Sequence, residues 1–189
     1  CIRDRVGRVL DALDNSPYKD NTIVVLWSDH GWHLGEKQHW TKGTLWEEST
    51  HCLMMLRVPG LTAPGGQCER FVSLLDIYPT LAELTGIQPP EGQTDGTSLV
   101  PLLKNPMAAS TPRALSAYAN HISIRTESFR YIRYTDGSEE FYDCSKDPHE
   151  WTNLIGNPEY AEAVAEIRTK VPSLSEMVPE VGKKGDKKK

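Results

Sequence analysis

The chain has 189 residues, with 21 Lys and Arg against 26 Asp and Glu and a formal net charge of −5 at pH 7. The acidic balance disfavours a nucleic-acid-binding protein, and no apolar run reaches the ~18 residues that a membrane-spanning helix requires. A hydrophobic content of 38%, with 5 Trp and 7 Tyr, is enough for a buried core and argues against a disordered chain.

Helical and strand patterns alternate in the first part of the chain. Apolar residues three and four apart predict an amphipathic helix over residues 2–14. The β-branched run at 23–27 is typical of a strand buried on both faces, as in a parallel sheet. Residues 51–58 predict a second central strand, and residues 72–86 predict a helix that Gly86 ends. This alternation predicts a mixed or parallel α/β sheet.

The pattern changes at about residue 113. A final helix is expected over residues 158–171, and Asp136-Gly137 is a hairpin signal. Four short alternating segments predict an antiparallel meander, at residues 114–118, 122–126, 131–134 and 140–142.

These elements predict an α/β fold in three parts. Residues 1–112 would form part of an α/β sheet domain, and residues 113–182 a small antiparallel sheet with one packed helix. Residues 183–189, Lys-Lys-Gly-Asp-Lys-Lys-Lys, are expected to form a disordered basic tail. The first expected helix starts at Cys1 without a preceding N-cap residue, so we expect a part of the polypeptide to precede it.

The loop after the first expected strand, residues 28–50, holds the candidate chemical groups, since α/β sheets bind ligands beyond the carboxyl ends of their strands. Asp29 and His30 together suit a divalent cation. Alternatively, Asp29 caps a turn and His30 is an ordinary loop residue. Lys42 could bind an anionic oxygen of sulfate or phosphate, or be a solvated surface lysine.

Histidine and tryptophan side chains are frequent in the same region. His33, His39 and His51 could act as acid, base or ligand, or be structural. The indoles of Trp32, Trp40 and Trp46 could stack on sugar rings or pack the loop. The four cysteines are far apart and match no zinc-binding or redox spacing.

Residues 21–36 closely resemble the metal-site segment of the type I sulfatases, in the alkaline phosphatase superfamily. The form Asp-His-Gly-Trp-x-Leu-Gly-Glu, at residues 29–36, looks most like the iduronate sulfatase branch. Further segments match the family in order, at residues 40–42, 58–60, 72–87, 95–99, 131–134, 140–143 and 147–154.

The resemblance implies an alkaline-phosphatase-like sheet domain that hydrolyses a sulfate ester on a sulfated sugar or polysaccharide. Asp29 and His30 would be two ligands of the active-site cation, usually Ca²⁺, although another divalent cation is possible. Lys42 matches the catalytic lysine that contacts the sulfate group. We expect His33, Trp32 and Trp40 to form a wall of the substrate site, and His51 is a candidate for contacting a metal ligand.

One part of the family pattern is absent from these 189 residues. The family nucleophile is a formylglycine made from Cys or Ser in the motif Cys/Ser-x-Pro/Ala-x-Arg, and neither Cys68 nor Cys144 is followed by it. Ser110-Thr-Pro-Arg113 has its arginine one position early. We therefore expect a C-terminal portion of a sulfatase that is inactive alone and needs the rest of its polypeptide, or self-association, to cover its sheet. By family habit the enzyme would be periplasmic, secreted or lysosomal.

Two alternative functions remain open at this stage. Hydrolases of phosphodiesters or phosphonates belong to the same superfamily, and a metal with a lysine does not separate sulfate from phosphate. The chain could also be a non-catalytic fragment that binds an anionic glycan through its Trp-rich loop and basic tail.

Overall fold

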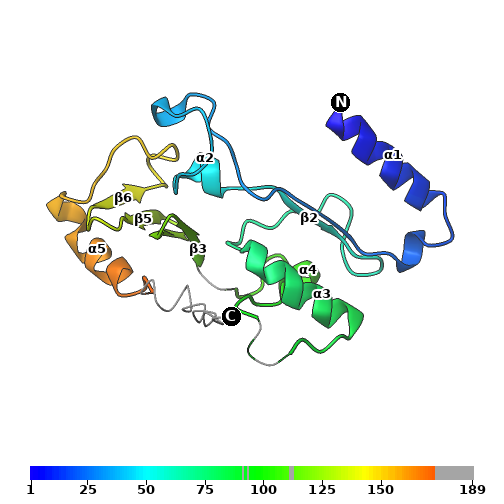
Figure 1. Ribbon diagram of the computed structural model, residues 1–189. Coiled ribbons are helices and arrows are strands. Elements are labelled where there is room, and N and C mark those ends of the chain that lie inside the picture. The colour runs from blue at the N-terminus through cyan, green and yellow to red at the C-terminus, as the bar shows by residue number, and fades with distance from the viewer. Residues whose placement is uncertain (91, 93, 111–112, 173–189) are drawn as a thin grey trace, which may run out of the picture. The chain divides into compact units, whose positions relative to one another are not determined.

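The computed structural model describes residues 1–90, 92, 94–110 and 113–172, so the expected tail of residues 183–189 lies outside the described part. The chain divides into two compact units. The first unit is Cys1–Gly31 with His51–Thr111, and the second is Trp32–Thr50 with Pro112–Lys189. Each unit contains its own sheet (Figure 1). Among the described residues, no helix combines the length and apolar character needed to cross a membrane.

The first unit contains a two-stranded sheet and several helices. The strands pair antiparallel, with Val24 opposite Arg57 and Trp27 opposite Met54. Its elements are α1 (Ile2–Asp14), the 3₁₀ helix η1 (Lys19–Asn21), β1 (Val24–Trp27), β2 (Met54–Arg57), the 3₁₀ helix η3 (Leu74–Asp76), α3 (Ile77–Thr85) and α4 (Val100–Lys104).

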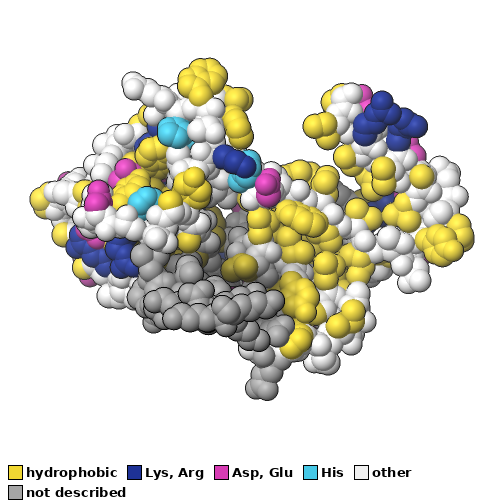
Figure 2. Space-filling model, viewed as in Figure 1, with side chains coloured by type: hydrophobic (Ala, Val, Ile, Leu, Met, Phe, Trp, Pro, Cys, Tyr) yellow, Lys and Arg dark blue, Asp and Glu magenta, His cyan; other side chains and the backbone are white. Residues whose placement is uncertain are grey.

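The two expected strands form, but the described part of the unit does not bury them on both faces. Leu26, Trp27 and Met55 are 37%, 50% and 55% exposed, and Figure 2 shows hydrophobic side chains gathered on the visible face of this unit. This exposure agrees with the expectation that further polypeptide or self-association covers the sheet, and the burial of residues 23–27 on both faces stays a prediction. A β-branched run reports apolar character, and it specifies neither the direction of the neighbouring strand nor what covers the faces.

Local hydrogen bonds explain where η3, which leads directly into α3, begins and where α3 ends. The Ser73 hydroxyl accepts from the Leu75 N–H, and a carboxylate oxygen of Asp76 accepts from the Ser73 N–H at 2.7 Å, which forms a capping box. Gly86 ends the helix at a φ of 72°, where glycine avoids the steric cost of other residues. The buried Thr80 hydroxyl accepts from the N–H of Leu99 at 2.8 Å and so joins α3 to the segment that leads into α4.

The second unit contains the antiparallel meander, in the order β3-β4-β5-β6, which confirms the expectation. Gly137, at a φ of 86°, lies in the turn between the last two strands, as expected. The elements are the 3₁₀ helix η2 (Glu36–Gln38), α2 (Glu47–Thr50), β3 (Arg113–Tyr118), β4 (His121–Thr126), β5 (Phe129–Arg133), β6 (Glu139–Asp143), the 3₁₀ helix η4 (Pro158–Tyr160) and α5 (Ala161–Arg168).

The two faces of this sheet have different partners because side chains alternate along a strand. Helix α5 covers one face (Figure 1). The other face packs against residues of the segment 32–50. The core on the α5 side comprises Ile124, Tyr131, Phe141, Val164 and Ile167. The core on the opposite side comprises Leu45, Ile132, Tyr142 and Cys144, with Trp46 and Tyr134 packed against it.

The segment 32–50 is where the observed division differs from the predicted division at residue 112. This segment lies early in the sequence but belongs to the second unit. The physical reason is its packing: Leu45 is 4% exposed and lies in one cluster with Ile132 and Tyr142 of the sheet. We call residues 32–50 the 32–50 loop below.

Asp143, at the end of β6, should make the stability of the second unit depend on acid pH. Burial alone would raise its pKa, but donors on Ser145, Tyr160 and Lys146 outweigh this and lower the pKa to about 2. An Asp with a lowered pKa stabilises the fold above its ordinary pKa, and this contribution is lost as the pH falls toward 2.

We expect the Asp143→Asn variant to unfold more easily than the wild type at pH 5. This difference in the free energy of unfolding should shrink by about 2 kcal/mol as the pH falls from about 5 to 2, because an amide does not titrate. Urea unfolding at a series of pH values measures the difference, and a gap independent of pH would contradict the expectation.

Candidate functional site

Asp29 and His30 lie directly after β1, in the first unit. Oδ2 of Asp29 is 3.4 Å from Nε2 of His30, and the Asp29 side chain is 81% exposed. Nδ1 of His30 is 2.7 Å from the carbonyl oxygen of Gly31. The Ser28 hydroxyl donates to the carbonyl of His30 at 2.6 Å and shapes the turn. The two candidate ligands are thus adjacent at the end of a strand.

This geometry fits a divalent cation for these two side chains. When Nδ1–H of a histidine donates to a carbonyl, Nε2 keeps the lone pair that a metal needs, as is usual for metal-binding histidines. In that tautomer the free lone pair of His30 would be on Nε2, which lies 3.4 Å from the Asp29 carboxylate. Ca²⁺ takes about 6–8 ligands, so the pair would supply part of a coordination shell. Within the described ranges, no group of three or more His, Cys, Asp or Glu could hold a metal.

Lys42 is exposed on the 32–50 loop, in the second unit. The backbone on either side of it is fixed by contacts. The carbonyl of Thr41 accepts from the N–H of His33 at 3.1 Å. Gly43 has a φ of 90° and lies so close to Tyr118 of β3 that a Cβ there would be 3.0 Å from the tyrosine hydroxyl. A side chain at residue 43 would therefore displace either the loop or Tyr118.

The three residues expected to form a substrate wall differ in exposure. Trp40 is 71% exposed and Trp32 49% exposed, whereas His33 is fully buried. Nε2 of His33 lies 2.7 Å from the hydroxyl of Thr44, and the His33 ring lies edge-on to Trp46, with centroids 6.0 Å apart. Burial lowers the pKa of His33. Only the two tryptophans therefore offer surface to a ligand in this structure, and His33 supports the loop from inside.

Histidines 39 and 51 fall in different units. His39 is half-buried beside His33, with ring centroids 5.4 Å apart, in the second unit. His51 is exposed in the first unit, ahead of β2. Its expected contact with a metal ligand stays a prediction.

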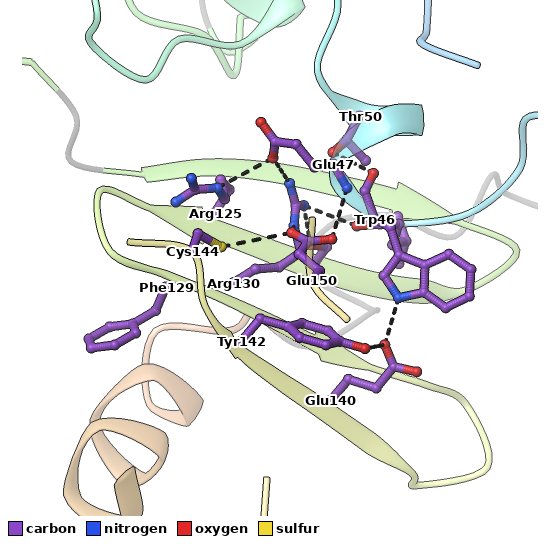
Figure 3. Close-up of polar contacts among 12 residues, drawn as sticks. Trp46, Glu47, Thr50, Arg125, Phe129, Arg130, Glu140, Tyr142, Cys144 and Glu150 are labelled. Carbon is purple, nitrogen blue, oxygen red and sulfur yellow. Dashed lines mark hydrogen bonds and ion pairs between the residues drawn. The ribbon is translucent and has the colours of Figure 1, made fainter. Parts of the chain in front are cut away.

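The sequence did not predict a buried charge cluster that anchors the 32–50 loop on the sheet (Figure 3). The Arg130 guanidinium bonds to the carboxylates of both Glu150 and Glu47. Arg130 is 1% and Glu150 0% exposed. Arg125 adds a second positive charge, with its Nε 3.3 Å from a carboxylate oxygen of Glu47. Two positive and two negative side chains thus balance one another at the junction of loop and sheet.

A second polar cluster joins the same loop to β6. A carboxylate oxygen of Glu140 accepts from the Trp46 indole N–H at 2.7 Å and from the Tyr142 hydroxyl at 2.7 Å (Figure 3). The Lys37 ammonium group lies 4.6 Å from the centre of the Trp46 ring and donates to the Tyr142 hydroxyl at 3.2 Å. In the sequence, the one signal that could have indicated the first of these clusters is a charged residue between apolar residues, as Arg130 is between Phe129 and Tyr131.

Comparison with known proteins places this arrangement in a family. The model of the family described as N-sulphoglucosamine sulphohydrolase, C-terminal, matches residues 35–177. The chain belongs to this family. The matched range includes Lys42, all four strands of the second unit's sheet and α5. The meander and its packed helix therefore lie within the sulphohydrolase C-terminal region.

Individual relatives agree with the family match. A sulfatase of Formosa agariphila is 40% identical over 171 residues, which are 90% of this chain and 33% of that protein. A solved structure in complex with its substrate D-glucosamine-2-N,6-O-disulfate is 30% identical, with a TM-score of 0.83 over 92% of this chain and 37% of that one. The phosphonate monoester hydrolase of Agrobacterium radiobacter is 30% identical, with a TM-score of 0.79 over 92% of this chain and 39% of that one. The chain thus spans about a third of the length of the curated relatives it matches.

Proposed function

We propose that this chain is the C-terminal part of a sulfatase that hydrolyses a sulfate ester on a sulfated sugar. The family match over residues 35–177 carries the proposal. The disulfated glucosamine bound by a structure of TM-score 0.83 supports the substrate class. The narrower assignment to the iduronate sulfatase branch is part of the proposal and rests on the form of residues 29–36.

We assign three roles to the described residues. Asp29 and His30 would hold a divalent cation, with Ca²⁺ as the proposed ion. When bound, such a cation supplies charge that polarises the sulfate oxygens. The Lys42 ammonium group would stabilise the negative charge that grows on those oxygens in the transition state. The exposed faces of Trp32 and Trp40 suit stacking on a sugar ring.

The nucleophile would come from outside these 189 residues. The sequence lacks the formylglycine motif that the resemblance to type I sulfatases implies, and we propose that a region upstream of Cys1 supplies it. We use the term extended polypeptide for this chain together with that upstream region. The same region would cover the exposed apolar side chains of β1 and β2, among them Leu26, Trp27 and Met55.

A test compares the extended polypeptide with the 189-residue chain on 4-nitrophenyl sulfate and on sulfated glucosamine in the presence of Ca²⁺. We expect the extended polypeptide to turn over both esters and the chain alone to turn over neither. Hydrolysis by the chain alone, or no sulfate release by a folded extended polypeptide, would contradict the proposal.

Hydrolysis of a phosphonate ester is the second candidate function. The similarity to the Agrobacterium radiobacter phosphonate monoester hydrolase, at 30% identity, favours it. Phenyl phosphonate esters should therefore be assayed alongside the sulfates. A higher kcat/KM for the phosphonate than for the sulfates would make phosphonate ester hydrolysis the preferred function. The proposed roles of Asp29, His30 and Lys42 would stay the same.

The Asp29→Asn variant tests the proposed cation site. Loss of one carboxylate charge should raise the Ca²⁺ concentration for half-maximal activity of the extended polypeptide by about 10- to 100-fold. Asp20, an exposed acidic residue in the same unit, provides the control variant Asp20→Asn. Equal Ca²⁺ titrations of the two variants would remove Asp29 from the site.

A further inference from the structure

The pair Arg130–Glu150 is buried in a way that apolar packing would not require. Both side chains are at most 2% exposed and are joined by a direct ion pair. Removing two charges from water costs several kcal/mol per ion, and apolar residues of similar size often stabilise a fold as well or better. The hydrogen bonds that the pair makes with the 32–50 loop suggest a role for these two buried charges.

On the loop side, both members of the pair bond to the backbone. The guanidinium of Arg130 donates to the carbonyl of Leu45 at 3.0 Å. The carboxylate of Glu150 accepts from the N–H of Glu47 at 2.9 Å. The Lys37 ammonium group donates to the carbonyl of Glu150. The loop is therefore held at residues 37, 45 and 47, on both sides of Lys42.

On the sheet side, the pair is fixed as well. Arg130 lies on β5 and also donates to the hydroxyl of Ser123 on β4 at 2.9 Å. Glu150 has a φ of 57°, and its N–H donates to the carbonyl of Asp147 at 3.1 Å. The anchor thus rests on two neighbouring strands and a tight turn, so a shift of the loop would require breaking buried charge-assisted hydrogen bonds, which are among the stronger ones.

We propose that Glu150 and Arg130 are positioning residues, which hold the 32–50 loop so that Lys42 presents its ammonium group to the substrate anion. This inference rests on the proposed function of Lys42. Leu45, which bonds to Arg130, is three residues from Lys42, and Gly43 packs on Tyr118 of the sheet. Few backbone bonds between Leu45 and Lys42 can therefore rotate freely. Such placement matters because a displacement of about 1 Å can cost up to about 100-fold in rate.

The main test is the Glu150→Gln variant of the extended polypeptide. It keeps the shape of the side chain and removes the charge that pairs with Arg130. We expect kcat for 4-nitrophenyl sulfate to fall about 10- to 100-fold, with KM changed less than about 3-fold, since the lysine acts mainly in the transition state. The matched control is Arg168→Ala, which breaks an ion pair between Glu139 and α5 that does not involve the 32–50 loop. A kcat of Glu150→Gln within about twofold of the control would overturn the proposal.

A double variant separates positioning from general stability. If Glu150 acts through Lys42, Glu150→Gln should lower kcat much less in a Lys42→Ala background than in the wild type. Full additivity of the two effects would overturn the proposal. Should Glu150→Gln not fold, Glu47→Gln replaces it, because Glu47 is 25% exposed on its side chain and bonds to the same guanidinium.

Hydrogen exchange on the 189-residue chain tests the inference without any activity. In Glu150→Gln, or in Glu47→Gln in its place, the amides of residues 41–44 should exchange faster, while those of α5 should keep the wild-type rates. Unchanged rates at 41–44 would overturn the proposal. If the extended polypeptide hydrolyses none of the esters but the exchange result holds, the proposed function fails and the anchoring of the loop stands.

Discussion

Replacing Lys42 by alanine should lower kcat of the extended polypeptide for a sulfate ester by about 100- to 1,000-fold. This is the usual cost of removing one group that stabilises negative charge in a transition state. Because the Lys42 side chain is exposed, the melting temperature should change little. Initial-rate assays at saturating ester, combined with thermal unfolding, measure both quantities.

Two further variants sharpen this result. Lys42→Arg keeps the positive charge but replaces a compact ammonium group with a planar guanidinium, so we expect partial recovery of kcat. Lys19, an exposed lysine in η1, provides the control Lys19→Ala, which should retain full activity. Equal activity of the Lys42→Ala and Lys19→Ala variants would exclude a direct role of Lys42 in the reaction.

Replacing Arg130 by alanine should lower the free energy of unfolding by about 3–5 kcal/mol, because the buried carboxylate of Glu150 loses its partner. Urea unfolding of the chain, followed by tryptophan fluorescence, measures the effect. The matched control, Arg168→Ala, removes a guanidinium that is 48% exposed, and should cost less than about 1 kcal/mol.

The double variant Arg130→Met with Glu150→Leu separates folding from positioning. Two apolar side chains of similar volume remove both buried charges, so stability should return to within about 1–2 kcal/mol of the wild type. The bonds to the backbone of Leu45 and Glu47 would still be missing, so we expect sulfatase activity to remain low. Recovery of both stability and activity would show that the ion pair serves the fold alone.

Elements with strong local patterns could be predicted from the sequence. The alternating segments after residue 113 and the Asp136-Gly137 turn predicted the meander, because side-chain period and turn chemistry are local properties. Asp29, His30 and Lys42 were identified as chemical groups from their place after a strand and from the resemblance of the segment to sulfatases. Their surroundings became visible only in the structure.

Features that depend on contacts distant in sequence could not be predicted. The β-branched run of β1 does not state whether its neighbour is parallel or antiparallel. Arg130 was not among the candidate residues, and it is buried because Glu47 and Glu150, which are 83 and 20 residues away in the sequence, meet it there. His33 had the residue type of a ligand-contacting group, and its burial arises from Trp46 and Thr44.

The path of the chain has a consequence for how this molecule can be divided. Because Trp32–Thr50 belongs to the second unit, the polypeptide passes between the units three times, after Gly31, after Thr50 and after Thr111. A cut near residue 112, where the pattern of expected elements changes, would therefore leave Leu45 and Glu47 on one fragment and Arg130 and Glu150 on the other. The N-terminal fragment would keep the whole first unit, but the C-terminal fragment would lack the 32–50 loop, which packs against one face of its sheet. We therefore expect the second unit to fold only when the lysine-bearing loop and the C-terminal sheet are expressed in one polypeptide.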